Sequence, residues 1–192
     1  MSEEYLVAHT APTLAGLKTG SLFPCAYSSW PVLLREIRAM NRLLRGKGLC
    51  LIPLRHRAGR ALLYLYRPAR LSRDLAAEDA ATLLEQEGYA DLRQSRALAE
   101  LIQRLERFED FPHEIGLFLS YPPEDVRGFI EHGGRNCKCV GCWKVYGDAK
   151  RAQDTFRAYK LCTDRYRAYS AMGATVARLA VADGASVPQS KA

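Results

Sequence analysis

The sequence predicts an α+β protein: a single domain over residues 1–183, in which five or six helices pack on a mixed sheet of four or five strands. Three observations predict this class. A chain of 192 residues is long enough for one domain with a substantial core. Apolar residues recur at helical spacing in several segments, and shorter apolar runs between turn residues are typical of strands. The two kinds of segment do not alternate regularly, which favours α+β over a doubly wound sheet.

The first quarter of the chain is predicted to hold one strand, one irregular segment and one helix. Residues 5–9 form a short apolar run and are the candidate first strand. Proline and glycine punctuate residues 10–25, so we expect a structured loop or a short helix there. Ser28 or Ser29 can cap the next helix, whose apolar residues recur at helical spacing as far as Leu44.

A hairpin and two helices are predicted next. Residues 49–54 and 61–67 are strand candidates on either side of a turn at residues 56–59, a pattern that indicates a hairpin. Residues 78–87 form a helix that Gly88 ends, and residues 95–108 form another with a clear apolar face.

The second half is predicted to hold two strands and three helices. Residues 114–121 are so apolar that we expect a central strand buried on both faces. A helix opens at Pro122 and Pro123 and closes at Gly133. Residues 143–146 form a last short strand, Asp148 caps a long helix, and a further helical stretch runs to about residue 182.

Composition and termini predict a soluble cytosolic protein. No apolar run approaches the roughly 20 residues that a membrane helix needs. The opening residues are acidic and lack the apolar stretch of a secretory signal. We therefore expect no membrane contact, and in a reducing compartment we expect no structural disulfides among the six cysteines. Residues 184–192 are small and polar and are expected to form a disordered tail.

Positive charge is concentrated in one segment. Residues 32–73 contain eleven basic residues and one acid, while the whole chain carries a net charge of +7. Such a segment attracts an acidic or phosphate-bearing partner, or is simply a solvated surface. Arg35, Arg38 and Arg42 form a stripe on the predicted helix and are the candidate nucleic-acid contacts. Tyr64 and Tyr66 share a strand face and would either stack on bases or pack in the core.

Three cysteines lie within six residues and form a candidate metal site. Cys137, Cys139 and Cys142 are soft sulfur donors of the kind that zinc and iron–sulfur clusters prefer. A tetrahedral site needs a fourth ligand, for which His132 and Cys162 are the candidates. A redox dithiol at Cys139 and Cys142, or free thiols on a loop, are the alternatives. The metal hypothesis makes the protein a metal- or thiol-linked accessory protein.

A second candidate site surrounds the predicted strand at residues 114–121. His113 is the candidate general base, with Glu114 as an orienting group or acid, and Tyr121 is a candidate ligand-binding residue. Neighbouring residues in a strand point to opposite faces, so the pair shares a site only if regular pairing starts after it. The alternative is a histidine at the rim of the core with an exposed glutamate. This hypothesis makes the protein a small-molecule enzyme or binder.

The N-terminal segment offers a third candidate site. His9 ends the predicted first strand and Lys18 follows a loop, where it is placed to bind a carboxylate or phosphate. A structured loop without function is the simpler interpretation. Neither a glycine-rich phosphate loop nor a nucleophile elbow is present, which disfavours a nucleotide-binding enzyme and a hydrolase.

Three stretches together carry a family resemblance: residues 12–18, residues 111–130 and residues 143–148. They resemble an uncharacterised family of bacterial cytosolic proteins known only as a domain of unknown function, and the resemblance covers residues 5–166. It implies no activity. In that family a cysteine often follows the position of His9, whereas this chain has Thr10, so any chemistry of that thiol would be missing here.

Overall fold

The computed structural model describes residues 1–107 and 111–183. The chain divides into two compact units: unit 1 comprises Met1–Arg67 and Tyr159–Ala192, and unit 2 comprises Pro68–Ala158. The prediction of one domain over residues 1–183 stays a prediction beside this division. The predicted disordered tail at 184–192 lies outside the described residues. None of the helices in the described ranges combines the length and hydrophobicity needed to cross a bilayer.

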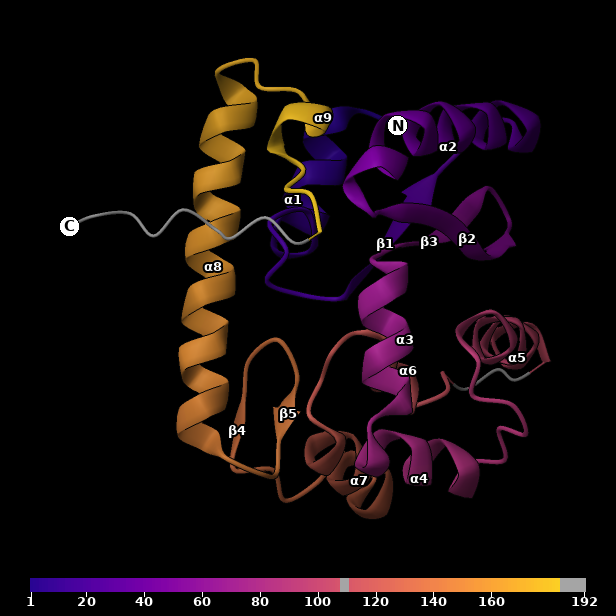
Figure 1. Ribbon diagram of the computed structural model, residues 1–192, viewed down its shortest axis with the longest axis vertical. Coiled ribbons are helices and arrows are strands. Elements are labelled where there is room, and N and C mark those ends of the chain that lie inside the picture. Colours follow the sequence, from indigo (N-terminus) through magenta and orange to yellow (C-terminus); the bar gives the residue numbers. More distant parts are fainter. Residues whose placement is uncertain (108–110, 184–192) are drawn as a thin grey trace. The chain divides into compact units, whose positions relative to one another are not determined.

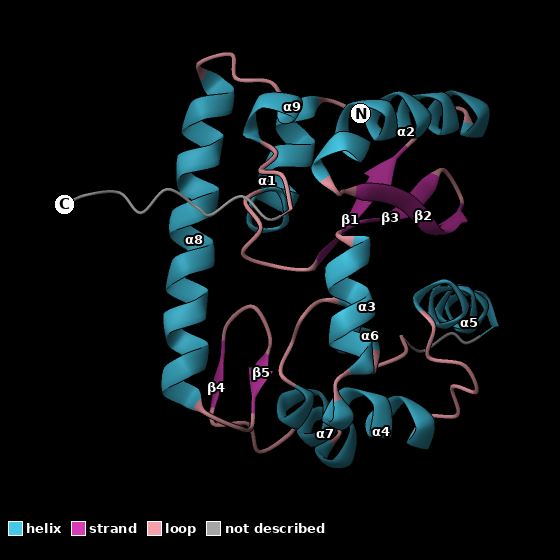
Figure 2. Cartoon of the chain, viewed as in Figure 1, coloured by secondary structure: helices cyan, strands magenta, loops and turns pink. Residues whose placement is uncertain are grey.

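The α+β class is confirmed, but the predicted sheet is wrong. In place of one mixed sheet of four or five strands, the described ranges hold a three-stranded antiparallel sheet and a two-stranded antiparallel hairpin (Figure 2). These ranges also contain nine α-helices, more than predicted: Glu3–Leu14 and Ile115–Phe118 lie where strands were predicted, and Pro68–Ala76 is an additional helix.

Unit 1 is built on the three-stranded sheet, in the order β1-β3-β2 (Figure 1). Its elements are α1 (Glu3–Leu14), β1 (Gly20–Ala26), α2 (Trp30–Leu44), the 3-10 helix η1 (Arg45–Lys47), β2 (Cys50–Arg57), β3 (Arg60–Tyr66) and α9 (Val176–Leu179). The long helix α8 (Ala149–Ala171) begins in unit 2 and ends in unit 1. One sheet face packs with α1, α2 and α9 around a core that includes Leu6, Leu33, Leu51, Leu63 and Val176.

The predicted first strand at residues 5–9 is wrong, since these residues lie in helix α1. The Ser2 side chain caps this helix by accepting a hydrogen bond from the Tyr5 N–H at 3.2 Å. Glu3 and Glu4 occupy its first turn, where the helix dipole favours acids. The buried side chains continue at helical spacing past residue 9, a signal that a five-residue window misses.

The irregular segment predicted at residues 10–25 instead contains the end of α1 and strand β1. Proline is tolerated only at sheet edges, bulges and strand starts, and Pro24 lies in β1, which is an edge strand. Phe23 and Cys25 alternate inward along this strand, as a half-buried strand requires.

The helix before Leu44 and the following hairpin are confirmed as α2, β2 and β3. Asn41 of α2 joins the helix to the edge strand: its side-chain amide donates to the Leu51 carbonyl and its oxygen accepts from the Leu51 N–H, both at 2.8 Å. This pair of bonds imitates a neighbouring strand. It satisfies backbone groups that an edge strand otherwise exposes.

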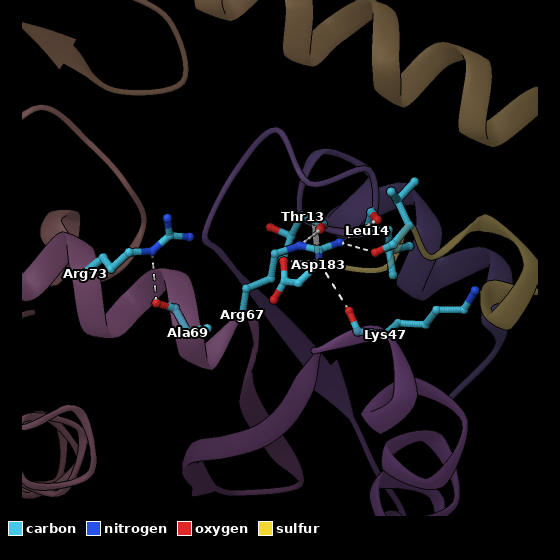
Figure 3. Close-up of polar contacts among 8 residues, drawn as sticks. Thr13, Leu14, Lys47, Arg67, Ala69, Arg73 and Asp183 are labelled. Atoms are coloured by element: carbon cyan, nitrogen blue, oxygen red, sulfur yellow. Dashed lines mark hydrogen bonds and ion pairs between the residues drawn. The ribbon is translucent and has the colours of Figure 1, made fainter. Parts of the chain in front are cut away.

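Arg67, the last residue of unit 1 before unit 2, is fully buried. Figure 3 shows its guanidinium among backbone carbonyls of α1 and η1 and the carboxylate of Asp183. It donates to Thr13 O and Leu14 O at 2.9 Å, and to Val181 O at 2.8 Å. Arg67 is therefore a structural residue and does not belong to the predicted basic surface.

Unit 2 is mainly helical. Its elements are α3 (Pro68–Ala76), α4 (Glu78–Gln86), α5 (Gln94–Arg107), α6 (Ile115–Phe118), α7 (Pro123–His132), β4 (Cys139–Val140), β5 (Lys144–Val145) and the first part of α8. The sequence predicted α4, α5, α7, the strand at β5 and the start of α8; the predicted residue Phe108 lies outside the described ranges. Asp148 caps α8 by accepting from the Arg151 N–H at 3.0 Å.

The predicted central strand at residues 114–121 is wrong. The segment forms successive turns and the single-turn helix α6, with the Ile115 N–H donating to Pro112 O and the Gly116 N–H to His113 O, both at 3.2 Å. A short apolar run fits a buried strand and a buried helical turn equally well. Burial on all sides is therefore correct, whereas the backbone conformation is not.

Candidate functional site

Unit 2 contains an open cavity of about 280 Å³. Three segments form its walls: the turns at residues 111–121, helix α7, and the β4–β5 hairpin. The lining residues are mostly aromatic or aliphatic: Phe111, His113, Ile115, Gly116, Tyr121, Asp125, Val126, Phe129, Val140, Gly141, Trp143 and Lys144. This volume is near the low end of the range for small-molecule pockets.

Two pairs of aromatic rings line the cavity. Tyr121 stacks on Trp143, with ring centroids 4.8 Å apart and planes 29° apart. His113 meets Phe129 edge to face at 4.8 Å. Phe156 of α8, which does not line the cavity, packs against Trp143 at 4.5 Å. Rings held by other rings lose little conformational freedom when a flat ligand enters.

Asp125 fixes the hairpin on α7. Its Oδ2 accepts from the Trp143 Nε1 at 2.6 Å, and its Oδ1 accepts from the backbone N–H groups of Tyr146 and Gly147 at 2.7 Å each. Only 3% of the residue is exposed. Three N–H donors on one buried carboxylate satisfy its charge, so Asp125 is a positioning group for Trp143.

Gly116 allows the turn segment of the cavity to pack closely against Val126 of α7 and against Tyr121. A Cβ atom at this position would lie 2.8 Å from Val126 Cγ2 and 3.1 Å from Tyr121 Cδ2. Any side chain here would push Tyr121 or Val126 away, so the absence of one sets the distance between the turn segment and α7.

Two basic side chains line the cavity within its described part. Lys144 donates through Nζ to Gly134 O at 2.7 Å and lies 5.6 Å from the centre of the Phe129 ring. His113 contacts the same ring from its edge. Tyr121 contributes a hydroxyl that donates to Cys142 O at 3.2 Å, and burial, followed by the nearby Cys142, raises its pKa to about 12.

The structure separates the predicted pair His113 and Glu114. His113 lines the cavity, whereas Glu114 is 2% exposed and accepts hydrogen bonds from Tyr89 Oη at 3.1 Å and Arg104 Nη1 at 3.3 Å. Arg104 also lies over the Tyr89 ring at 4.4 Å. Burial, together with the charge of Glu114, raises the pKa of Tyr89. Glu114 thus belongs to a buried structural network and is not placed to orient His113.

The cysteine loop forms one rim of the cavity. Cys139 begins β4 opposite Val145, and Cys142 lies exposed at the hairpin turn, while Cys137 precedes the hairpin. Within residues 1–107 and 111–183, no group of three or more histidine, cysteine, aspartate or glutamate side chains is arranged to hold a metal ion. The zinc or iron–sulfur hypothesis, with His132 or Cys162 as fourth ligand, gains no support from this arrangement.

His9 and Lys18 belong to unit 1 and do not line the cavity. His9 is exposed on α1 between Tyr5, at 4.5 Å, and Phe23, at 5.9 Å. Partial burial and the nearby Arg167 lower its pKa. Thr10 is fully buried and donates to Leu6 O at 2.7 Å, so a thiol at this position would face the interior of unit 1.

The basic stripe of Arg35, Arg38 and Arg42 is exposed on α2. Nucleic-acid binding by it stays a prediction. Tyr64 and Tyr66 stack on each other at 4.8 Å and are 1% and 6% exposed, which favours their role in core packing over base stacking.

Sequence reasoning grouped Asp125 with His113 and Tyr121, but missed three important residues of the cavity: Phe129, Trp143 and Lys144. A signal for them was present, because all three lie in the stretches that carried the family resemblance. Those stretches are separate in the sequence, and only the fold of unit 2 shows that they share one cavity.

The fold and the site thus define an α+β protein with a small aromatic cavity in its helical unit. Residues 6–180 match the family model described as Protein of unknown function (DUF3793), and the chain belongs to this family. The resemblance seen in the sequence is thereby confirmed. Comparison with curated proteins and with solved structures gave no match.

Proposed function

We propose that this protein binds a small molecule containing a flat ring in the cavity of unit 2. The observation that carries the proposal is the cavity itself, which is lined by the Tyr121–Trp143 stack and the His113–Phe129 pair. Concave sites with mostly apolar linings and few polar groups are the usual form of small-molecule sites.

The walls are fixed before any ligand enters. Asp125 holds Trp143 through a 2.6 Å hydrogen bond, and Phe156 packs against the indole. A preformed site binds more tightly than one that must order its side chains on binding. At the mouth, Val140 is 68% exposed and Phe111 is 38% exposed, so apolar side chains border the entrance.

Binding is better supported than acid–base catalysis by the predicted pair. Glu114 accepts hydrogen bonds from Tyr89 and Arg104, so His113 lacks the carboxylate partner that the sequence suggested. A metal site is less well supported, because no three donor side chains of the described residues are grouped to hold an ion.

The test uses calorimetry with neutral one- and two-ring compounds, among them 3-phenylpropanamide. We expect saturable binding with one molecule per chain. Phe129→Ala removes one flat wall and should weaken binding roughly 3- to 10-fold, the usual contribution of an aromatic contact. Ile130→Ala is the matched control, because Ile130 follows Phe129 on α7 and is also half-buried but does not line the cavity.

Fluorescence gives a second readout. The chain has two tryptophans, and Trp30→Phe leaves only Trp143. Saturable change in Trp143 emission on addition of the amide would place the compound in the cavity. Absence of binding across the panel, or equal losses in Phe129→Ala and Ile130→Ala, would contradict the proposal.

A further inference from the structure

We infer that the ligand of this cavity carries an anionic group, such as a carboxylate, beside its ring, and that Lys144 and His113 receive this group. The inference rests on the function proposed above and names the class of its ligand. It follows from the positions of the charged and hydrogen-bonding groups around Phe129.

Both basic side chains converge on one ring. The His113 ring centroid is 4.8 Å from that of Phe129, and Lys144 Nζ is 5.6 Å from it. A ligand that contacts Phe129 in the cavity therefore lies near an ammonium group and an imidazole, both of which line the same cavity. An imidazole can donate a hydrogen bond in either protonation state, and an ammonium group has three N–H donors.

Two contacts hold the Lys144 side chain in place and leave N–H groups of its ammonium for a ligand. One of its N–H groups goes to Gly134 O at 2.7 Å, and it contacts a ring face, two constraints that limit its rotamers. The two remaining N–H groups of the ammonium can serve a ligand carboxylate. Lys144 is half-buried, and the attraction between opposite charges is stronger at a partly buried site than in bulk water.

The carboxylate of Asp125, which also lines the cavity, does not disfavour an anionic ligand. The Asp125 carboxylate accepts three hydrogen bonds, from Trp143, Tyr146 and Gly147, and is 3% exposed. Its charge is thus balanced by N–H donors and is turned into the hairpin.

A cationic ligand is the competing class, because aromatic walls also attract cations. It would have to approach the ammonium group of Lys144, which already lies over the Phe129 ring. It would also find the Asp125 oxygens engaged by other donors. The charges of the cavity therefore favour an anion.

The experiment compares three compounds with one skeleton: 3-phenylpropanoate, 3-phenylpropanamide and 3-phenylpropylammonium. Calorimetry on the full chain at neutral pH and low salt should show the carboxylate binding about tenfold more tightly than the amide, as for a charge-assisted hydrogen bond. The ammonium compound should bind most weakly.

Two variants, each of which removes one lysine from the hairpin region, show whether the preference for the carboxylate comes from Lys144 itself or from the net charge of the protein. Lys144→Met should bring the carboxylate to within about twofold of the amide. Lys138→Met is the matched control: Lys138 also donates to a backbone carbonyl, Gly147 O at 2.7 Å, but does not line the cavity. It should preserve the preference of the native chain.

The outcomes are distinguishable. If the amide binds and the carboxylate binds no more tightly, the inference is wrong and the proposed function stands. If the ammonium compound has the highest affinity of the three, the inference is also wrong and the cavity is a site for cations. If none of the three binds, both proposals fail. Should Lys144→Met not fold, the salt dependence of the native chain decides: rising salt must erode the preference for the carboxylate while amide binding stays constant.

Discussion

Arg67 and Asp183 form an ion pair in unit 1, with Nη1 and Oδ1 2.7 Å apart, although 116 positions separate them in the chain. The arginine is fully buried, while about a quarter of the aspartate side chain is exposed. The pair therefore attaches the C-terminal part of unit 1 to the end of β3. Arg67 also donates to the backbone carbonyls of Thr13, Leu14 and Val181, which a multidentate donor can satisfy together.

We predict that Arg67→Met lowers the free energy of unfolding by about 3–5 kcal/mol, because it leaves buried carbonyls and a carboxylate without their donor. Arg73→Met is the control: Arg73 donates only a long 3.4 Å bond to Ala69 O on the surface of α3, so its loss should cost under about 0.5 kcal/mol. Urea unfolding measures both. Similar midpoints for the two variants would contradict the structural role of Arg67.

Asn41→Ala should lower stability by about 1–2 kcal/mol. The Leu51 N–H and carbonyl would lose their partner, a cost that the better helix propensity of alanine offsets only in part. Arg42→Ala, an exposed neighbour on the same helix, should be nearly neutral. Thermal unfolding of both variants checks this. Because β2 is an edge strand, self-association of Asn41→Ala on concentration is a further expected sign.

Glu114→Gln should change stability without changing binding. The buried carboxylate accepts from Tyr89 and Arg104, so its neutralisation should cost about 1–3 kcal/mol. Because Glu114 does not line the cavity, the affinity for 3-phenylpropanamide should stay within twofold of the native value. A tenfold loss of affinity at unchanged stability would return Glu114 to the ligand site.

Thiol reactivity should follow burial. Cys142 is exposed and should react first with a disulfide reagent at pH 8, whereas burial raises the pKa of Cys162 to about 11. The thiolate of Cys162 should then be about a hundredfold scarcer than that of an ordinary thiol. Cys142→Ser should remove the fast phase and Cys162→Ser should leave it intact. Since the folded pKa of Cys162 is raised, its contribution to stability is complete below about pH 9 and declines toward pH 11.

Helices with long periodic patterns could be predicted from the sequence, whereas short apolar runs could not. Leu33, Ile37, Met40 and Leu44 specify one face of α2 unambiguously. Residues 5–9 and 114–121 are too short for periodicity to separate a strand from a helical turn, and tertiary packing decided both. Strand β1 was missed because it contains Pro24. A proline is acceptable in a strand only at positions such as a sheet edge, and the sequence does not show which strand lies at an edge.

The candidate site was predicted only in part. His113 and Tyr121 were identified from local context and line the cavity, but Glu114 and the cysteines were grouped by proximity in sequence. Phe129 and Lys144 gain their roles from the packing of α7 against the hairpin, and Asp125 from three hydrogen bonds across 18 to 22 positions. Such long-range juxtapositions are properties of the folded chain.

The division of the chain at Arg67 has a consequence for biosynthesis. Unit 2 is one continuous segment, so it can fold as soon as its last residues leave the ribosome. Unit 1 is interrupted in the sequence by unit 2. The guanidinium group of Arg67 can therefore form its hydrogen bonds to Val181 and Asp183 only after unit 2 has been translated. The three strands of the sheet are thus translated early, whereas the hydrogen bonds of Arg67 are complete only when the C-terminal residues of unit 1 have been made.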